Sequence, residues 1–222
     1  GRDEAVLKAT AEEIADLHGV KVTPVAADVS SADGQRALLA ACPDPDILVN
    51  NNGGPPLRDF RELSRAQILE GVTQNMVTPL ELIQAVIDPM CQRGFGRIVN
   101  ITSLSVYQPI PGLDLSSGAR AGLTAFLAGV ARTVADKNVT INHILPGKFD
   151  TDRIRSTISF AAGKSGLSEE EQAKKVANEI PARRLGSPDE FGKTCAFLCS
   201  AHAGYITGQN IVLDGGLYPS AF

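Results

Sequence analysis

The 222-residue sequence has no tryptophan, only two methionines and 5% aromatic residues, and it has no excess of positive charge. Its 21 lysines and arginines against 25 acidic residues give a formal charge of −4, so the broad basic surface of a general nucleic-acid binder is not expected. No apolar run approaches the roughly 20 residues needed to span a bilayer. We therefore expect a cytoplasmic protein that binds neither nucleic acid nor membrane.

Cysteine and histidine are also sparse. The four cysteines form no C-x-x-C pair, and Cys195 and Cys199 lie four residues apart on an apolar helical pattern. Two reduced, buried thiols are the simplest interpretation of that pair. The three histidines, His18, His143 and His202, are not spaced like metal ligands, so the sequence predicts no metal site.

What the sequence does contain is an alternation of strand-like and helical segments. Apolar or β-rich runs fall at 21–27, 47–49, 97–101, 139–145 and 210–213. Helical patterns occupy 3–18, 31–41, 64–93, 116–135, 168–178 and 188–200. Buried strands separated by helices predict an α/β fold, a doubly wound parallel sheet covered on both faces.

The domain organisation follows from the lack of a clear linker. No stretch is rich enough in proline, glycine and serine to divide the chain, so we expect a single domain over 1–222. Residues 151–187 form a polar excursion between a strand and the next helix, which makes them a candidate lid for the substrate.

Ligands of open α/β sheets bind beyond the carboxyl ends of the strands. The residues directly after the expected strands are therefore candidates for binding. They are Asp28, Val29, Asn50, Asn51, Asn52, Gly53, Thr102, Ser103, Pro146 and Gly147.

Six segments, in order along the chain, resemble the classical short-chain dehydrogenase/reductase family. They are Asp28-Val29; Asp46 to Gly53, with Asn52 where the family has alanine; Asn75; Arg97 to Ser103; Pro146-Gly147 followed by Thr151; and Gly208 with Asp214-Gly215-Gly216. The resemblance runs from Gly1 to about Tyr218 and is greatest to the β-ketoacyl-acyl-carrier-protein reductase-like group.

This resemblance implies a Rossmann-type sheet and a reversible NADP(H)-dependent reduction of a carbonyl, a 3-oxoacyl group or another ketone, to a secondary alcohol. It also implies a homotetramer or homodimer, for which the small residues Gly118, Gly122, Ala125 and Gly129 would allow close helix approach. The implied cofactor contacts come from Asp28, Val29, Asn50, Asn51, Asn52, Gly53, Pro146, Gly147 and Thr151. Arg2 could meet the 2′-phosphate, which favours NADP, with NAD as the alternative.

The family's phosphate-binding unit, a strand, a glycine-rich turn and a helix, is not found in the sequence. We expect that unit before Gly1, so that the first βα unit is missing from this chain. The segment from Gly1 to Asp3 then resembles the end of the family's second strand.

The active-site motif departs from the family. Counting from Ser103, which resembles the catalytic serine, the usual tyrosine and lysine positions hold Ser116 and Arg120. A serine hydroxyl is a weaker acid than tyrosine, whose pKa is about 10, and arginine keeps its proton to above about pH 12.

Three alternatives follow. In the first, the protein is a reductase in which Ser103, Ser116 and water carry the proton, Arg120 stabilises charge and Asn75 supports a water. In the second, Tyr107 or Lys148 replaces the missing tyrosine. In the third, the protein binds a dinucleotide without turnover and acts as a sensing or interaction protein.

Overall fold

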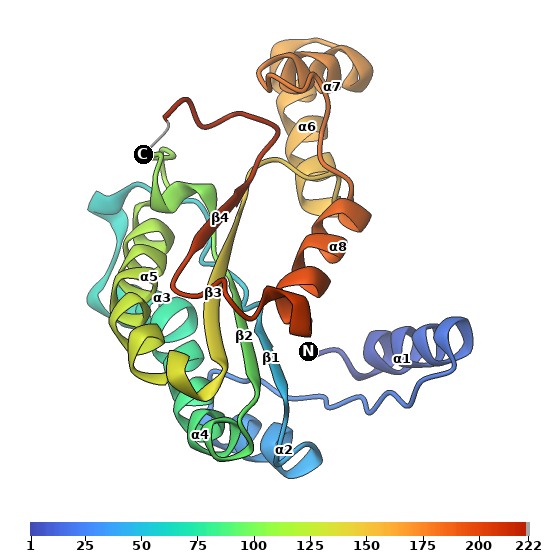
Figure 1. Ribbon diagram of the computed structural model, residues 1–222. Coiled ribbons are helices and arrows are strands. Elements are labelled where there is room, and N and C mark those ends of the chain that lie inside the picture. The colour runs from blue at the N-terminus through green and yellow to red at the C-terminus, as the bar shows by residue number, and fades with distance from the viewer. Residues whose placement is uncertain (221–222) are drawn as a thin grey trace.

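The computed structural model describes residues 1–220 and confirms the parallel α/β sheet (Figure 1). Its strands are β1 (Ile47–Asn50), β2 (Gly96–Ile101), β3 (Val139–Pro146) and β4 (Asn210–Leu213). They lie in the order β1-β2-β3-β4, and each neighbouring pair is parallel. Parallel pairs need crossover connections, which the helices between the strands provide.

Apart from α6, the helices in the described residues lie close to the predicted ranges, with α3 and α4 together occupying the range of one predicted helix. They are α1 (Glu4–His18), α2 (Ala32–Ala41), α3 (Arg65–Val72), α4 (Thr78–Arg93), α5 (Asp114–Val134), α6 (Asp152–Ser165), α7 (Glu169–Asn178) and α8 (Pro188–Cys199). Within residues 1–220, none of them is both long and apolar enough to cross a membrane.

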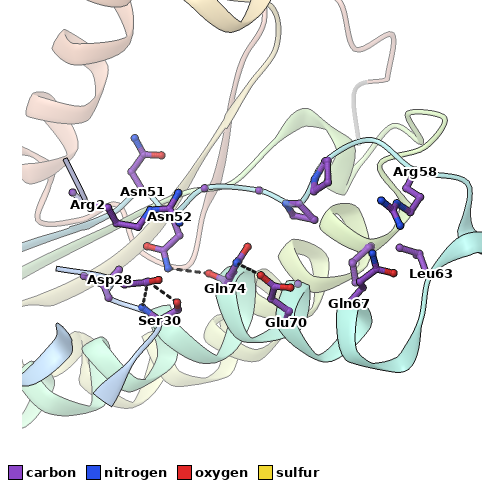
Figure 2. Close-up of a pocket in the computed structure, with 18 of the residues that line it drawn as sticks. Arg2, Asp28, Ser30, Asn51, Asn52, Arg58, Leu63, Gln67, Glu70 and Gln74 are labelled. Carbon is purple, nitrogen blue, oxygen red and sulfur yellow. Dashed lines mark hydrogen bonds between the residues drawn. The ribbon is translucent and has the colours of Figure 1, made fainter. Parts of the chain in front are cut away.

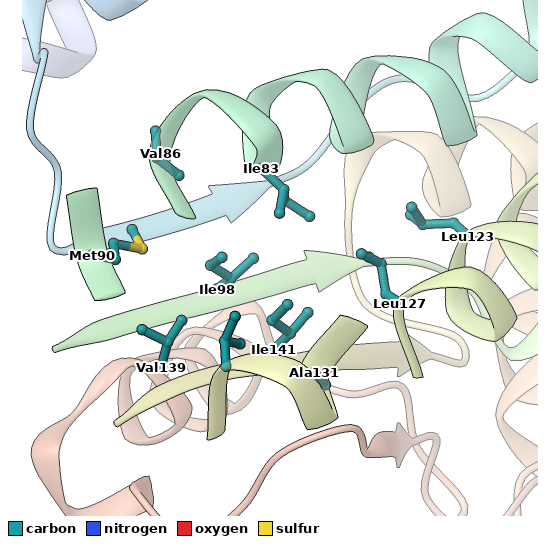
Figure 3. Close-up of a cluster of buried hydrophobic side chains, with 10 residues drawn as sticks. Ile83, Val86, Met90, Ile98, Leu123, Leu127, Ala131, Val139 and Ile141 are labelled. Atoms are coloured by element: carbon teal, nitrogen blue, oxygen red, sulfur yellow. The ribbon is translucent and has the colours of Figure 1, made fainter. Parts of the chain in front are cut away.

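Helices cover both faces of the central strands. On one face, α4 and α5 pack against alternate residues of β2 and β3, with Ile83, Leu127, Ile98 and Ile141 among the buried side chains (Figure 3). On the other face, α8 packs against the intervening residues through a cluster that includes Val99. This alternation of period two explains why the strands are apolar on both faces.

The edge strand β1 is less well covered than the central strands, on the face of the sheet that α8 packs against. Ile47 and Val49 lie opposite Arg97 and Val99 in the register, yet they are 46% and 44% exposed. In Figure 1, α1 lies well to the side of β1.

The β-rich run 21–27 does not form a strand, which corrects that expectation. In the described residues, its backbone makes one ladder-like contact, in which the N–H of Ala27 donates to the carbonyl of Gly1 at 2.8 Å. A strand needs a row of such bonds with a neighbour.

The segment 151–187 contains two helices where one was predicted. The missed helix is α6, which packs against α7 outside the sheet (Figure 1). Thr151 is its N-cap but makes no side-chain capping bond, so the usual signal of a helix start is weak. Its function as a lid stays a prediction.

The predicted helix over 64–93 is interrupted by a π-helical turn, η2 (Thr73–Val77), between α3 and α4. The turn carries Asn75, which is 2% exposed. Single π-turns within α-helices are frequent at functional sites, because they reorient one side chain relative to the helix.

Candidate functional site

Two cavities open near the carboxyl ends of the strands. The larger, of about 720 Å³, has Ser103, Ser116 and Arg120 in its lining, and we call it the Ser103 cavity. The smaller, of about 410 Å³, is lined by Arg2 and its neighbours, and we call it the Arg2 cavity. Residues 51–55 line both cavities, so the loop after β1 is their common wall.

A buried polar network lies at the Ser103 cavity. Ser116 Oγ donates to Asn75 Oδ1 at 3.1 Å and accepts from Arg120 Nε at 3.2 Å. Asn75 Nδ2 donates to the carbonyl of Gly53 at 2.8 Å. The network therefore connects α5, the π-turn and the loop after β1.

Arg120 is held by the backbone of two strand ends. Its Nη1 donates to the carbonyl of Ile101 at 2.7 Å, and its Nη2 donates to the carbonyl of Asn52 at 3.4 Å. Burial, with a smaller contribution from the charge of Arg153, lowers the pKa of Arg120 to about 10. The guanidinium therefore stays protonated at neutral pH, and its positive charge is weakly solvated.

Ser103 follows β2 and begins a short 3-10 turn. Its Oγ accepts the backbone N–H of Ser105 at 3.1 Å, so it serves as the N-cap of that turn. The side chain is half-buried and lines the Ser103 cavity. Because the Ser105 amide uses one of its lone pairs, the hydroxyl proton of Ser103 can be donated into the cavity.

The loop after β1 approaches the network closely. A Cβ built on Gly54 would lie 3.5 Å from Ser116 Oγ, whereas one on Gly53 would meet no atom within 4 Å. The backbone of Gly53 is therefore open to a ligand. Asn51 lines both cavities, and Asn52 is anchored by a bond from its Nδ2 to the carbonyl of Gln74 at 2.9 Å.

Asn50 is the predicted cofactor residue that lies apart from the others. Its side chain is 4% exposed and donates to Asn100 Oδ1 at 2.9 Å, between β1 and β2. It is not part of the lining of either cavity as the described residues form it.

The loop after β3 contributes Pro146, Gly147 and Thr151 to the lining of the Ser103 cavity. Gly147 is needed for close packing, because a Cβ there would lie 2.7 Å from the Cβ of Asp214. The ends of β3 and β4 therefore approach each other too closely for a side chain at this position.

The Arg2 cavity contains the other predicted cofactor residues, Arg2, Asp28 and Val29 (Figure 2). Asp28 Oδ1 accepts the backbone N–H and the hydroxyl of Ser30, at 3.0 and 2.6 Å. Chiefly these hydrogen bonds, with a smaller contribution from the charge of Arg2, lower the pKa of the Asp28 carboxyl. The cavity thus has a fixed acceptor and a cation near each other.

The two residues considered as substitutes for tyrosine have other contacts. The Tyr107 hydroxyl accepts from Asn210 Nδ2 at 2.9 Å, and its ring stacks on Tyr218. Lys148 lines the Ser103 cavity but pairs with Glu179. Among residues 1–220, no tyrosine belongs to the lining of this cavity.

One lining residue that the sequence did not single out is Arg153. It lies at the start of α6 and lines the Ser103 cavity with Thr151 and Ile154. Its position became evident only with α6, because a charged residue in a polar segment carries no signal of its own. Within the described part of the chain, no group of histidine, cysteine or acidic side chains could hold a metal ion.

Comparisons with known proteins place the chain among reductases. A family model described as enoyl-(acyl carrier protein) reductase matches residues 1–218. The chain is 35% identical over 173 residues to acetoacetyl-CoA reductase of Cupriavidus necator, which covers 78% of this chain and 66% of that protein. It is 32% identical over 215 residues to the 3-oxoacyl-[acyl-carrier-protein] reductase FabG of Aquifex aeolicus, which covers 95% of this chain and 82% of FabG.

Solved structures show the same similarity. The crystal structure of L-sorbose reductase from Gluconobacter frateurii, in complex with NADPH and L-sorbose, superposes with a TM-score of 0.92 at 27% identity. The match covers 99% of this chain and 85% of that one. The two chains therefore share their architecture over nearly the whole of the present sequence.

Proposed function

Since the chain belongs to the short-chain dehydrogenase/reductase family and is β-ketoacyl-acyl-carrier-protein reductase-like, we propose that it uses NADP(H) to reduce a carbonyl to a secondary alcohol. The substrate class is a ketone, of the 3-oxoacyl type or another. The support comes from relatives named as acetoacetyl-CoA and 3-oxoacyl reductases, and from a structural neighbour complexed with NADPH.

The observation that carries the proposal is the convergence of Ser103, Ser116 and Arg120 on one cavity that shares a wall with a second. An elongated ligand with two ends, such as a dinucleotide, fits a pair of cavities joined along residues 51–55. The open backbone at Gly53 would allow its close approach.

The cofactor's contacts divide between the two cavities. In the Arg2 cavity, Asp28 and Val29 would hold the adenine, and Arg2 would bind the 2′-phosphate that distinguishes NADP from NAD. In the Ser103 cavity, Pro146, Gly147 and Thr151 would hold the nicotinamide end. We assign Asn51, Asn52 and Gly53 to the cofactor as well, and Asn50 to a supporting contact with Asn100.

The bound cofactor would supply the hydride. Ser103 would donate a hydrogen bond from its hydroxyl to the carbonyl oxygen, without transferring the proton, and would thereby orient and polarise the carbonyl. As negative charge develops on that oxygen, the nearby charge of Arg120 would stabilise it, and burial increases the strength of this interaction. Ser116 would give a proton to the product oxygen, and Asn75 would support the water that restores it.

A second candidate function is dinucleotide binding without turnover, as a sensing or interaction protein. Two observations favour it: the Ser116 hydroxyl already donates to Asn75 Oδ1, and no tyrosine lines the cavity within residues 1–220. Both functions require NADP(H) binding, so only turnover separates them.

The test is NADPH oxidation by the protein with a panel of ketones and 3-oxoacyl thioesters. The reductase proposal expects turnover, and a loss of about 100-fold or more in kcat for Ser103→Ala, because that change removes a donor to the reacting oxygen. Ser105→Ala is the matched control, because its buried hydroxyl has no hydrogen-bond partner in the described structure. NADPH binding without turnover on the whole panel would favour the second function.

We also propose that the protein is a cytoplasmic homodimer or homotetramer, and that residues 151–187 close over the substrate. Phe126 on α5 is 53% exposed, and a Cβ on Gly118 or Gly129 would meet no atom of the chain within 4 Å. Such a face could pack against a second copy. Light scattering during size-exclusion chromatography tests the assembly, and a monomer at micromolar concentration would contradict it.

A further inference from the structure

The Ser103 cavity has an uneven charge. Its lining includes three cationic side chains, those of Arg120, Lys148 and Arg153. No acidic side chain belongs to this lining in the described part of the chain. A concave site with cations and no acid attracts anions.

Two of the three cations already have partners. Arg120 donates to the backbone of Ile101 and Asn52 and to Ser116. Lys148 pairs with Glu179. These contacts orient the side chains of Arg120 and Lys148, so Arg153 is the cation most available to a ligand.

Arg153 has no ion pair or side-chain hydrogen bond in the described structure, although acidic residues flank it in sequence. Asp150 is bound by Arg155 through two bonds of 2.8 and 3.0 Å, and Asp152 lies 3.9 Å from the same guanidinium. Arg155 thus neutralises the acids that could have paired with Arg153. The charge of Arg153 also acts on Arg120, whose pKa it helps to lower, so the two guanidiniums repel each other.

We infer that Arg153 binds an anionic group of the substrate, so that the preferred ketone is an oxo acid with a free carboxylate. This inference rests on the proposed function and adds the substrate class. A guanidinium binds a carboxylate through two parallel hydrogen bonds. An anion near Arg153 would also relieve its repulsion with Arg120.

The rest of the cavity indicates the remainder of such a substrate. Leu104, Ile110, Leu113, Ile154, Phe191 and Leu217 contribute apolar lining. A short hydrocarbon chain between the ketone and the carboxylate would contact these side chains, while Ser103 and Arg153 bind the two polar ends.

The experiment compares oxo acids with their methyl esters, which keep the ketone and lose the charge. Acetoacetate, 4-oxopentanoate and 5-oxohexanoate are each tested against the ester, for NADPH-dependent turnover and for binding by calorimetry in the presence of NADPH. Arg153→Met is compared with Lys164→Met, which removes the same charge from the same helix outside the cavity lining and leaves Arg155 with Asp150 and Asp152.

The wild type should prefer at least one acid over its ester, and Arg153→Met should remove about 10- to 100-fold of that preference. The KM for the ester and the Kd for NADPH should change little. Lys164→Met should keep the preference. Equal use of acid and ester by the wild type, or an equal loss in Arg153→Met and Lys164→Met, would overturn the inference.

Three further outcomes separate the inference from its premise. If Arg153→Met weakens NADPH binding and leaves the acid preference intact, the arginine contacts the cofactor's phosphates, and the inference is wrong. If the wild type binds an oxo acid through Arg153 but oxidises no NADPH, the carboxylate site stands and the proposed reaction fails. If no acid binds, the site is absent.

Discussion

At the scale of single residues, the proposed chemistry depends on the side chain at position 116. Ser116 is short, and its Oγ lies between Asn75 and Arg120. The Ser103 cavity, of about 720 Å³, lies beside it. The two hydrogen-bond partners of Ser116 are therefore held in place. A substitution at position 116 changes mainly the acid–base strength of the side chain there.

We predict that Ser116→Tyr combined with Arg120→Lys raises kcat for ketone reduction by roughly 100-fold or more, because a positioned general acid contributes about 10²- to 10⁴-fold. Steady-state NADPH oxidation measures it. The matched control is Ser117→Tyr with Arg120→Lys, which puts the phenol at a position outside the cavity lining. A folded Ser116 variant with unchanged kcat would show that the geometry does not suit the family's acid.

His143 on β3 makes a second residue-scale prediction. It is 2% exposed, its Nδ1 has no hydrogen-bond partner in the described structure, and burial lowers its pKa from 6.5 to about 4. Between these two values the unfolded chain binds a proton that the folded protein excludes. Stability should therefore fall as the pH drops from 6.5 toward 4, by up to about 3 kcal/mol.

Urea unfolding at pH 7.5 and pH 5 measures this dependence. Carboxyls with lowered pKa, such as Asp28 and Glu190, titrate below this interval, so they contribute little to the difference. His143→Gln should make the two free energies of unfolding nearly equal. An unchanged pH dependence in that variant would refute the assignment.

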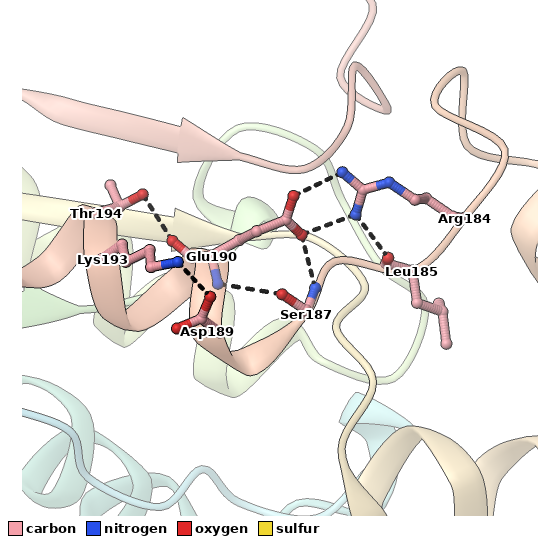
Figure 4. A network of polar contacts seen from close by, with 7 residues as sticks. All are labelled: Arg184, Leu185, Ser187, Asp189, Glu190, Lys193 and Thr194. Atoms are coloured by element: carbon pink, nitrogen blue, oxygen red, sulfur yellow. Dashed lines mark hydrogen bonds and ion pairs between the residues drawn. The ribbon is translucent and has the colours of Figure 1, made fainter.

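At the scale of elements, helix starts show how local sequence sets structure. Ser187 Oγ accepts the N–H of Glu190, the Glu190 carboxylate accepts the N–H of Ser187, and Pro188 occupies the first turn (Figure 4). Arg184 adds two bonds to the same carboxylate, which mainly accounts for a Glu190 pKa of about 2. Ser168 caps α7 in the same way, but α7 packs on α6 and not on the sheet.

The two caps predict different outcomes. Ser187→Ala should reduce the global free energy of unfolding by about 1 kcal/mol, because α8 packs on the sheet. Ser168→Ala should affect α7 locally and change global unfolding little, because α7 packs on α6. Chemical denaturation measures both. Equal global losses would show that the segment 151–187 unfolds together with the sheet.

The sequence predicted the elements with strong periodicity, including the strands β1 to β4. It did not predict α6, because only Ile158 and Ala162 of that helix are buried, so its apolar periodicity is weak. It did not predict the π-turn either, because a turn with one extra residue leaves no mark in apolar spacing. The run 21–27 contains β-forming residues, but in the described structure it has no neighbouring strand with which to form a row of hydrogen bonds. A strand requires both.

At the scale of the whole molecule, the sheet places the ends of β1, β2 and β3 together, and the site follows from that. Ser103 and the glycine loops were predictable, because motifs at strand ends meet in this architecture. Ser116, on α5, was predicted from its spacing to Ser103 in the motif of the family that the chain resembles. The bonds from Arg120 to Ile101 and Asn52 were not predictable, because they join positions far apart in the chain. Arg153 was missed because a charged residue in a polar segment carries no signal of its own.

The arrangement also predicts how stability is distributed. The helices α6 and α7 lie outside the sheet layers (Figure 1), and their buried residues are Ile158, Ala162 and Gln172. Their amides should exchange hydrogen faster than those of β2 and β3, because few buried contacts oppose local opening. Exchange followed by mass spectrometry tests this, and NADPH with an oxo acid should slow it in α6. Protection equal to that of β3 in the free protein would contradict a mobile lid.

The central claim is that this chain transfers a hydride to a carbonyl at the Ser103 cavity. Its most direct test uses NADPH deuterated at C4 of the nicotinamide, a panel of oxo acids and other ketones, and mass spectrometry of the products. The account predicts a secondary alcohol with one deuterium on its carbinol carbon, formed by the wild type and by Ser105→Ala but strongly reduced in Ser103→Ala. Measurable NADPH binding without labelled alcohol from any ketone would contradict it.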